Sequence, residues 1–322
     1  MRNINLLTIL FVLLALGCSS RGTVREDHKG DQSRIKDMRS YSQGRAAVKI
    51  DARWGYIDPY GVVVIDADYS AAGMFSEGIA PVKVRDKWGY IDREGRMVVI
   101  AKYLDAGSCS QGLMPVKMER GWGYIDREGK TVIEPQFDRA MPFTHNYAAV
   151  RLGKSWGFVN RQGRIMINPK YAYAGGFADD MAPFSKSGKD DTFGYMNDDG
   201  VTVIAPQFDL ARDFSQGLAA VKDDGKWGFT DDRGRLRVTL KFDNAGNFSG
   251  GLAPVSYRGR WGFIDKSGKM VIEAKYAAAA QYTEWGALVV DDKGWGFYID
   301  RHGEKVNPVN GVSMGEAAIA GK

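Results

Sequence analysis

The feature that most constrains the fold is a Trp-Gly dipeptide that returns along the chain at a nearly constant interval. Successive copies stand roughly 34 residues apart, one interval is three residues longer, and Phe193-Gly194 fills the one place without tryptophan. A fixed period of this length is the signature of a repeat architecture, in which each unit buries apolar side chains against its neighbours. The period therefore predicts eight repeats, marked by Trp54, Trp88, Trp122, Trp156, Phe193, Trp227, Trp261 and Trp295.

Other positions keep the same phase. Most units have an aromatic residue 13 positions before the marker, an alanine 18 positions after it and a glycine seven positions after it, although Gly303 arrives one residue late. Cys109 occupies the place that Phe75 and Phe143 hold in the adjacent units. We therefore expect Cys109 to replace a core aromatic as a buried, unreactive thiol.

A single unit, residues 75–106, shows the local structure that the repeat favours. Residues 80–84 alternate between two faces, residues 88–91 carry aromatics on one face, and residues 97–100 are short and apolar. Turns at 85–87 and 92–95 separate them, and Gly95 can adopt positive φ. Two consecutive hairpins result, so each unit is predicted to be a three-stranded antiparallel meander linked to the next through residues 103–106.

The fold class that follows is all-β, with eight antiparallel three-stranded repeats of about 34 residues. A helical repeat of the same period is disfavoured, because no stretch long enough for a helix keeps an apolar period of 3.6. Eight small sheets in series could close into a propeller-like ring, although a unit of about 34 residues is short for a four-stranded blade. An open, curved β-repeat array fits equally well, and the sequence leaves both architectures open.

The repeats resemble those of the WG-repeat family, also called the KWG repeat, which occurs in bacteria. Lys87-Trp88-Gly89 and Lys226-Trp227-Gly228 match the three-letter form, and the resemblance extends over residues 41–309. It implies β-repeats and an exported or surface role. It implies no chemistry, because the family has no established catalytic residues.

The N-terminal residues are typical of a bacterial export signal. Arg2 precedes an apolar run, residues 6–16, that is too short to span a bilayer comfortably. The end of this run and the next two residues, Leu14-Ala15-Leu16-Gly17-Cys18, resemble a relaxed lipobox. This resemblance implies cleavage before Cys18 and acylation of Cys18 with fatty acids such as palmitate. Ser19 after the cysteine favours the outer membrane by analogy with enteric bacteria. An ordinary secretory leader with an incidental cysteine is the alternative.

These features divide the chain into four segments. We expect a lipoprotein signal peptide at residues 1–17, a lipidated cysteine and flexible tether at 18–40, eight repeats at 41–309 and a C-terminal tail at 310–322. The predicted location is the cell envelope, with the protein anchored in the lipid bilayer through acylated Cys18.

Charge and composition exclude several classes of protein. The formal net charge is +5, but Arg2 contributes one charge and residues 19–40 a net +2, so that residues 41–322 carry only +2. Such a body lacks the basic footprint of a nucleic-acid binder. The three histidines, His28, His145 and His302, are too scattered for a histidine metal site, so we expect no cofactor and no metal.

The repeated tryptophans favour packing over ligand contact. A large aromatic at one phase of every unit is what stacking between repeats requires. Acidic pairs also recur, but at predicted turns, where Asp and Gly are favoured for backbone reasons, and they lack the full calcium-loop pattern. Weak cation binding is the alternative for these pairs: Asp190-Asp191, Asp198-Asp199, Asp223-Asp224, Asp231-Asp232 and Asp291-Asp292.

Departures from the repeat supply the candidate binding residues. The fifth unit has a first hairpin loop, residues 185–192, that is three residues longer than its neighbours, and insertions in repeat proteins often lie on the binding face. Trp285 stands where Gly78, Gly112, Gly217 and Gly251 stand in other units, so it could cap the array or contact a partner. The binding candidates are Ser185, Lys186, Ser187, Lys189, Asp190, Asp191 and Trp285.

Three functions compete at this stage. The sequence favours a non-enzymatic binding or scaffold module for a protein, peptide or glycan partner, since no nucleophile elbow, phosphate-binding loop or His-Glu-x-x-His motif is present. A glycoside or other hydrolase on a propeller-like fold stays open, because such chemistry needs only two carboxylates that are close in space. A purely structural envelope component is the third reading.

Overall fold

The computed structural model describes residues 35–39, 41–59, 62–186, 192–292 and 296–306. Every regular element in this part of the chain is a β-strand, and every pairing is antiparallel. No helix in these residues is long and apolar enough to cross a membrane. The predicted all-β repeat architecture is confirmed.

The strands form successive four-stranded meanders. The first half of the chain contains β1 (Ile35–Met38), β2 (Ala46–Ile50), β3 (Arg53–Ile57), β4 (Val63–Tyr69); β5 (Ala71–Ala72), β6 (Ile79–Val84), β7 (Lys87–Asp92), β8 (Met97–Tyr103); β9 (Asp105–Ala106), β10 (Met114–Met118), β11 (Gly121–Ile125), β12 (Thr131–Phe137); and β13 (Arg139–Ala140), β14 (Tyr147–Leu152), β15 (Ser155–Asn160), β16 (Ile165–Ala174).

The second half repeats the pattern. It contains β17 (Ala182–Lys186), β18 (Phe193–Met196), β19 (Thr202–Phe208); β20 (Leu210–Ser215), β21 (Leu218–Asp223), β22 (Lys226–Thr230), β23 (Leu236–Phe242); β24 (Asn244–Ala245), β25 (Ala253–Tyr257), β26 (Arg260–Ile264), β27 (Met270–Tyr276); and β28 (Ala278–Thr283), β29 (Gly286–Val290), β30 (Gly296–Ile299), β31 (Lys305–Val306). The long β16 serves the fourth and fifth repeats at once and joins them in one seven-stranded sheet.

The prediction of three strands per repeat is wrong. Each repeat begins with a further strand, formed by the segment read as a linker, such as β9 ahead of β10. This strand often pairs over only two residues, which is too short for an alternating pattern to be visible in the sequence. A short first strand is also how a repeat of this period accommodates four strands.

The prediction that residues 18–40 form a flexible tether is also partly wrong. The last of these residues include β1, which pairs with β2 and supplies the first strand of the first sheet. The polar segment around residues 35–38 favours a tether, but a strand at a sheet edge is held mainly by backbone hydrogen bonds.

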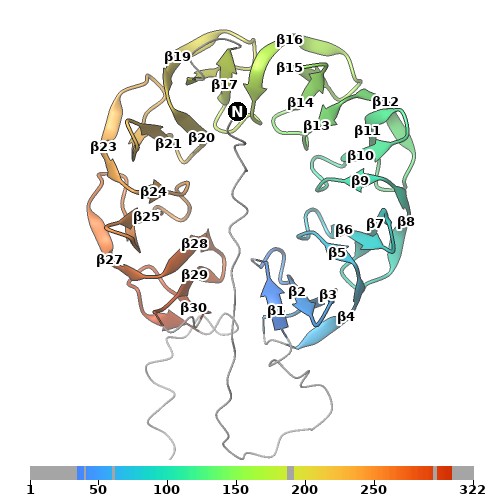
Figure 1. Cartoon of the computed structure of the whole chain (residues 1–322), viewed down its shortest axis with the longest axis horizontal. Coiled ribbons are helices and arrows are strands. Elements are labelled where there is room, and N and C mark those ends of the chain that lie inside the picture. Colours follow the sequence, from blue (N-terminus) through green and yellow to red (C-terminus); the bar gives the residue numbers. More distant parts are fainter. Residues whose placement is uncertain (1–34, 40, 60–61, 187–191, 293–295, 307–322) are drawn as a thin grey trace, which may run out of the picture.

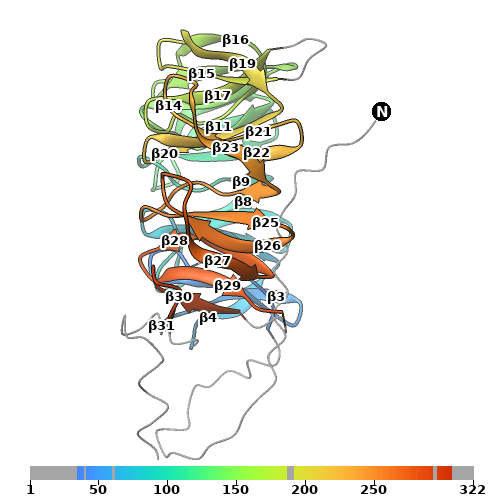
Figure 2. The same ribbon diagram turned by 90° about the vertical axis from the view of Figure 1, so that its left-hand side faces the viewer.

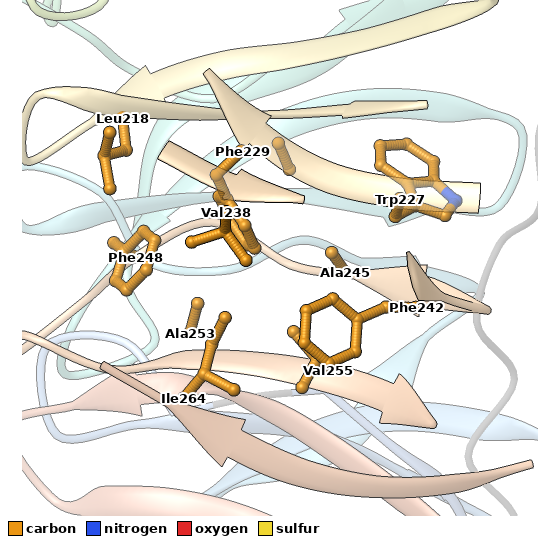
Figure 3. Packing of buried hydrophobic residues seen from close by; sticks show 11 residues of the cluster. Leu218, Trp227, Phe229, Val238, Phe242, Ala245, Phe248, Ala253, Val255 and Ile264 are labelled. Carbon is orange, nitrogen blue, oxygen red and sulfur yellow. The ribbon is translucent and has the colours of Figure 1, made fainter. Parts of the chain in front are cut away.

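The sheets stand side by side around a ring (Figure 1). The first strand of each sheet lies toward the middle of the ring and the fourth strand on the outside, and the strands run through the thickness of the ring (Figures 1 and 2). We call these the inner and outer strands. The core lies between sheets: in Figure 3, Trp227 and Phe229 of one sheet and Phe248 and Val255 of the next belong to one buried cluster.

One aromatic contact recurs between neighbouring sheets. The aromatic two residues after the marker packs on the aromatic at or just beyond the end of the next inner strand, as Tyr124 does on Phe143 with ring centroids 4.8 Å apart. The same contact links the last sheet to the first, where Tyr298 lies 5.9 Å from Tyr41. Among the described residues no strand pairing joins these two sheets. The array is therefore open in its strand pairing, while side chains bring its ends together.

The glycine of the Trp-Gly dipeptide has a steric role. A Cβ on Gly228 would stand 2.5 Å from the carbonyl oxygen of Val238 in the outer strand. The equivalent glycines, Gly55, Gly89, Gly123, Gly157, Gly194 and Gly262, meet the same obstacle at 2.3–2.5 Å. The outer strand thus crosses directly over this position, and only glycine leaves room for its backbone.

Turns at one end of the strands are joined from sheet to sheet. Ser110 donates its hydroxyl hydrogen to the carbonyl oxygen of Phe143 in the next sheet at 2.6 Å, and Ser42, Ser76, Ser215 and Ser249 make the same bond. Each bond satisfies a backbone acceptor of a neighbouring inner strand. The repeated serine therefore fixes the position of one repeat against the next.

Cys109 lies where the repeat register predicts. It is 1% exposed and belongs to the same buried cluster as Tyr90. Burial raises the pKa of the Cys109 thiol to about 12, and the nearby carboxylate of Glu77 raises it further. The thiol is therefore protonated at neutral pH and behaves as a small apolar side chain.

Candidate binding site on the inner strands

The marker tryptophans are largely enclosed by neighbouring sheets. Trp54, Trp122 and Trp227 are 6–8% exposed, and Trp88, Trp156 and Trp261 are half-buried. Trp295 lies outside the described residues. Side chains that fill the space between sheets are unavailable to a partner, so the site must be sought at other positions.

The predicted loop is only partly covered by the structure. Ser187, Lys189, Asp190 and Asp191 lie outside the described residues. Lys186 is exposed at the end of β17, but Ser185 is 4% exposed inside that strand and pairs with Phe193. The interpretation of Ser185 as a loop contact is therefore wrong, because the strand extends further than its polar sequence indicated.

Trp285 lies where the two ends of the array meet. It is half-buried and packs against the cluster that contains Tyr41, Leu288 and Tyr298. Its backbone N–H donates to the hydroxyl oxygen of Thr283 at 3.1 Å, while its buried indole Nε1 has no hydrogen-bond partner among the described residues. This placement gives Trp285 a part in packing the last sheet against the first.

One column of the repeat varies in chemistry from sheet to sheet. It is the residue just before the recurring aromatic, which lies at or a few residues beyond the end of the inner strand and is replaced by Cys109 in one repeat, and we call it the inner position. In the described part of the chain the inner positions are Met74, Ser108, Pro142, Gly176, Asp213, Asn247 and Gln281. Asp213 alone among these seven carries a charge.

Asp213 is an acceptor without a donor. It lies on β20, exposed to solvent, and none of the described residues reaches its carboxylate with a hydrogen bond or an ion pair. Enclosure by the surrounding protein raises the pKa of Asp213, and the positive charge of Arg212 only partly offsets this. A side chain inside a ring can be exposed to solvent and still be incompletely hydrated, because protein surrounds it on several sides.

Asp213 faces the preceding repeat. Its Oδ1 lies 3.2 Å from where a Cβ on Gly175 would stand. Its charge contributes to the raised pKa of Tyr173 and of Tyr195, after burial as the main cause. Tyr173 is 37% exposed on β16, and its ring meets the edge of Phe193 at 5.5 Å.

Arg212 faces the following repeat instead. Its guanidinium lies 4.9 Å from the centre of the Trp227 ring and 3.4 Å from Oδ1 of Asn244. No carboxylate of the described residues lies within ion-pair distance of it, and burial lowers its pKa. Its backbone oxygen accepts a 2.7 Å hydrogen bond from the Tyr195 hydroxyl. The two neighbouring charges therefore point to opposite sides of β20.

Local sequence explains why a side chain fits at position 212. Four repeats have proline in the adjoining strand, and there the equivalent residue is glycine, because a Cβ would come within 2.6–2.8 Å of the proline ring. These pairs are Gly73 with Pro81, Gly107 with Pro115, Gly175 with Pro183 and Gly246 with Pro254. The sixth repeat has Ala220 in place of proline, which leaves room for Arg212.

A hollow opens on the outer strand β4. It has a volume of about 390 Å³ and is lined by Val63, Val64, Ile65, Asp66, Asp68, Tyr69, Glu94 and Gly95. Among the described residues, no three His, Cys, Asp or Glu side chains are grouped so as to hold a metal ion. The three carboxylates of this hollow thus form no metal centre.

Comparison with known proteins identifies the repeats. The pattern of the WG-containing repeat matches residues 54–88, 88–120, 122–155, 156–189, 193–227, 227–261 and 261–290, which is more than half of the chain. No curated protein has a sequence that matches this chain.

Solved structures share the fold at low identity. A crystal structure of a eukaryotic initiation factor is 11% identical, with a TM-score of 0.57 over 84% of this chain and 87% of that one. The dihydro-heme d1 dehydrogenase NirN, in complex with DHE, is 12% identical, with a TM-score of 0.53 over 80% and 70%. Hsv2p of Kluyveromyces lactis is a weaker likeness, 10% identical with a TM-score of 0.46 over 67% and 86%. The first two likenesses indicate a propeller-like fold.

Proposed function

Because the chain belongs to the WG-containing repeat family, we propose that it is a non-enzymatic lipoprotein of the cell envelope that binds a protein, peptide or glycan partner. One observation carries the proposal. Residues repeated at a fixed phase are used in packing between sheets, whereas the inner positions differ in every repeat and include exposed side chains. Variable side chains on a rigid repeat scaffold are typical of binding proteins.

The anchoring part of the proposal rests on the leader. Cys18 lies outside the described residues, and its support is the apolar run and the lipobox-like residues that end at Gly17. Acyl chains on Cys18 would hold the protein in the outer membrane, because each buried methylene contributes about 0.8 kcal/mol. The ring would then carry its binding surface close to that membrane.

Replacing Cys18 with alanine should release the protein from the membrane, because no acyl chains can be attached. Fractionation of cells into soluble and detergent-extracted membrane proteins measures this. Cys109→Ala is the matched control, since it removes the other cysteine, a buried one, and should leave the protein in the membrane fraction. Retention of the Cys18→Ala protein in that fraction would refute the lipid anchor.

Charges placed on the inner strands should reduce partner capture. Met74 and Met141 are 44% and 38% exposed beside β5 and β13, so Met74→Glu with Met141→Glu should remove partners that wild-type protein captures from envelope extract. The matched control is Val132→Glu with Met166→Glu, at positions 43% and 50% exposed on the outer strands. Quantitative mass spectrometry of the captured material compares the two pairs.

The result of this capture experiment distinguishes a binding protein from a purely structural component. Loss of capture with the inner pair alone supports a binding surface on the inner strands. Equal loss with the outer pair, or no specific capture by the wild-type protein, would contradict the proposal and favour a purely structural component.

A further inference from the structure

The hollow on the outer strand β4 brings carboxylates together with an aromatic ring. Its volume of about 390 Å³ is in the range of sites that hold a small ligand or a side chain. No positively charged side chain is part of its lining, which consists of residues 63–65, Asp66, Asp68, Tyr69, Glu94 and Gly95. The hollow therefore offers open space with negative charge beside an aromatic ring.

Two of the three carboxylates have no partner. Asp66 and Asp68 are exposed on β4, and neither carboxylate accepts a hydrogen bond or forms an ion pair among the described residues. Arg53 donates at 3.4 Å to the backbone oxygen of Asp68 and not to its carboxylate. Glu94 differs, because its Oε2 accepts a 3.1 Å hydrogen bond from Arg96. Unpaired carboxylates in the wall of a hollow attract a cation that can donate hydrogen bonds to them.

Four other repeats carry a lysine at the place of Asp68. In each of them the lysine Nζ lies over the ring of the next residue on the outer strand, 5.2–5.4 Å from the ring centre. An ammonium group at this distance is attracted by the face of the ring. The four pairs are Lys102 with Tyr103, Lys170 with Tyr171, Lys241 with Phe242 and Lys275 with Tyr276.

The first repeat has the ring without the lysine. Tyr69 is half-buried and lines the hollow, whereas its equivalents in the next six repeats are at most 5% exposed. Those equivalents are Tyr103, Phe137, Tyr171, Phe208, Phe242 and Tyr276. The ring that four repeats cover with their own ammonium group is therefore accessible from the hollow in the first repeat, where two unpaired carboxylates accompany it.

We propose that this hollow binds the ammonium group of a lysine side chain from a polypeptide partner, with Asp66 and Asp68 as counter-ions and Tyr69 as the aromatic neighbour. The partner's lysine takes the place that the chain's own lysines take in four other repeats. A metal ion fits less well, since among the described residues no three carboxylates are grouped so as to hold one. The site lies on the outside of the ring, apart from the inner positions, and so goes beyond the proposed function (Figure 1).

The probe is the blocked pentapeptide Gly-Gly-Lys-Gly-Gly, and its counterpart with an Nε-acetylated lysine is the control. Acetylation removes the positive charge and keeps the peptide backbone and the methylene chain. Residues 41–322 carry a net charge of +2, so a general attraction between the protein and a cationic peptide is not expected. Titration of the whole protein in detergent micelles, followed through broadening of the peptide's lysine NMR signals, should show saturable binding of the lysine peptide alone.

The repeat itself supplies a variant that blocks the site. Asp68→Lys introduces the residue that four other repeats carry at this place, so the protein should fold, and the introduced ammonium group should occupy the face of Tyr69. Binding of the lysine peptide should fall at least tenfold. Glu134→Lys is the matched control, because it makes the same change in charge at an exposed residue of β12 and should leave binding unchanged. Asp68→Asn, which only removes a charge, should weaken binding about threefold or more.

The aromatic contribution has its own pair of variants. Tyr69→Phe keeps the ring and should change the affinity by less than about twofold, since Lys241 lies over a phenylalanine in the sixth repeat. Tyr69→Leu keeps an apolar side chain without the ring and should weaken binding about threefold or more. Thermal unfolding of each variant separates loss of the site from loss of the fold, and Asp68→Asn decides the question if Asp68→Lys does not fold.

Three results would overturn the inference: no saturable binding by the wild-type protein, equal binding of the acetylated peptide, or equal weakening by Asp68→Lys and Glu134→Lys. None of them bears on the capture of envelope partners, which is tested through Met74 and Met141 on the inner side of the ring. Failure of the peptide experiment and failure of the proposed function are therefore distinguishable.

Discussion

Replacing Gly228 with alanine should destabilise the protein by about 3 kcal/mol or more. A Cβ at this position would lie 2.5 Å from the carbonyl oxygen of Val238 and 3.0 Å from the backbone nitrogen of Leu240. Both are backbone atoms of β23, so relief requires the outer strand to move away from β22, against its cross-strand bonds. Overpacking of a well-packed core costs about 1–3 kcal/mol, and more where backbone must shift. Chemical unfolding followed by tryptophan fluorescence measures the change.

Gly225 in the same sheet is the matched control. It lies in the turn between β21 and β22, with φ of +78° and no other atom within 4 Å of an added Cβ. Gly225→Ala therefore meets only the cost of a left-handed conformation, about 1–2 kcal/mol. Equal effects of the two substitutions would contradict a steric role for the glycine of the Trp-Gly dipeptide.

The repeat phase could be predicted because the same physical demand returns in every unit. Contacts that recur from sheet to sheet require the aromatic marker, the glycine after it and the turn glycine. The position of Cys109 within the repeat likewise predicted that it lies in the core. The innermost strand could not be predicted in the same way. In the second repeat it pairs only through Ala71 and Ala72, which is too short for an alternating pattern.

The late arrival of Gly303 has a local cause in the last repeat. Val289 pairs with Phe297, whereas the equivalent Val255 pairs with Gly262, so one extra residue lies between the marker and the end of β30. Tyr298 consequently takes the place that Phe263 holds in the preceding repeat and reaches Tyr41. Sequence periodicity left closure undecided, because it carries no information on where the two ends of the array lie.

The inner position was missed because it is not repeated. The interruptions of the repeat pattern point to the longer loop and to Trp285 as binding residues. The available signal was a comparison of one column of the repeat, in which Asp213 stands among apolar, small and uncharged residues. The column itself can be read from the sequence, since it directly precedes the aromatic that stands 13 positions before the marker, but its place on the inner side of the ring is known only from the structure.

Replacing Trp122 with alanine should cost about 3–5 kcal/mol, because the side chain is 7% exposed between two sheets and its removal leaves a large cavity. It packs in a cluster with Phe137, Ala140 and Phe143, and it pairs with Phe137 across β11 and β12. The loss should appear as a lower midpoint of denaturant unfolding.

The chain itself supplies the control for this position. Phe193 holds the marker place in the fifth repeat and pairs with Phe208 as Trp122 pairs with Phe137. Trp122→Phe should therefore retain most of the stability, at a cost of about 1–2 kcal/mol for the volume lost. If the tryptophan served a partner and not the packing, Trp122→Ala would reduce partner capture while leaving the unfolding midpoint unchanged. A shared loss of stability that Trp122→Phe largely restores is the result expected of a side chain whose task is to hold one sheet against the next.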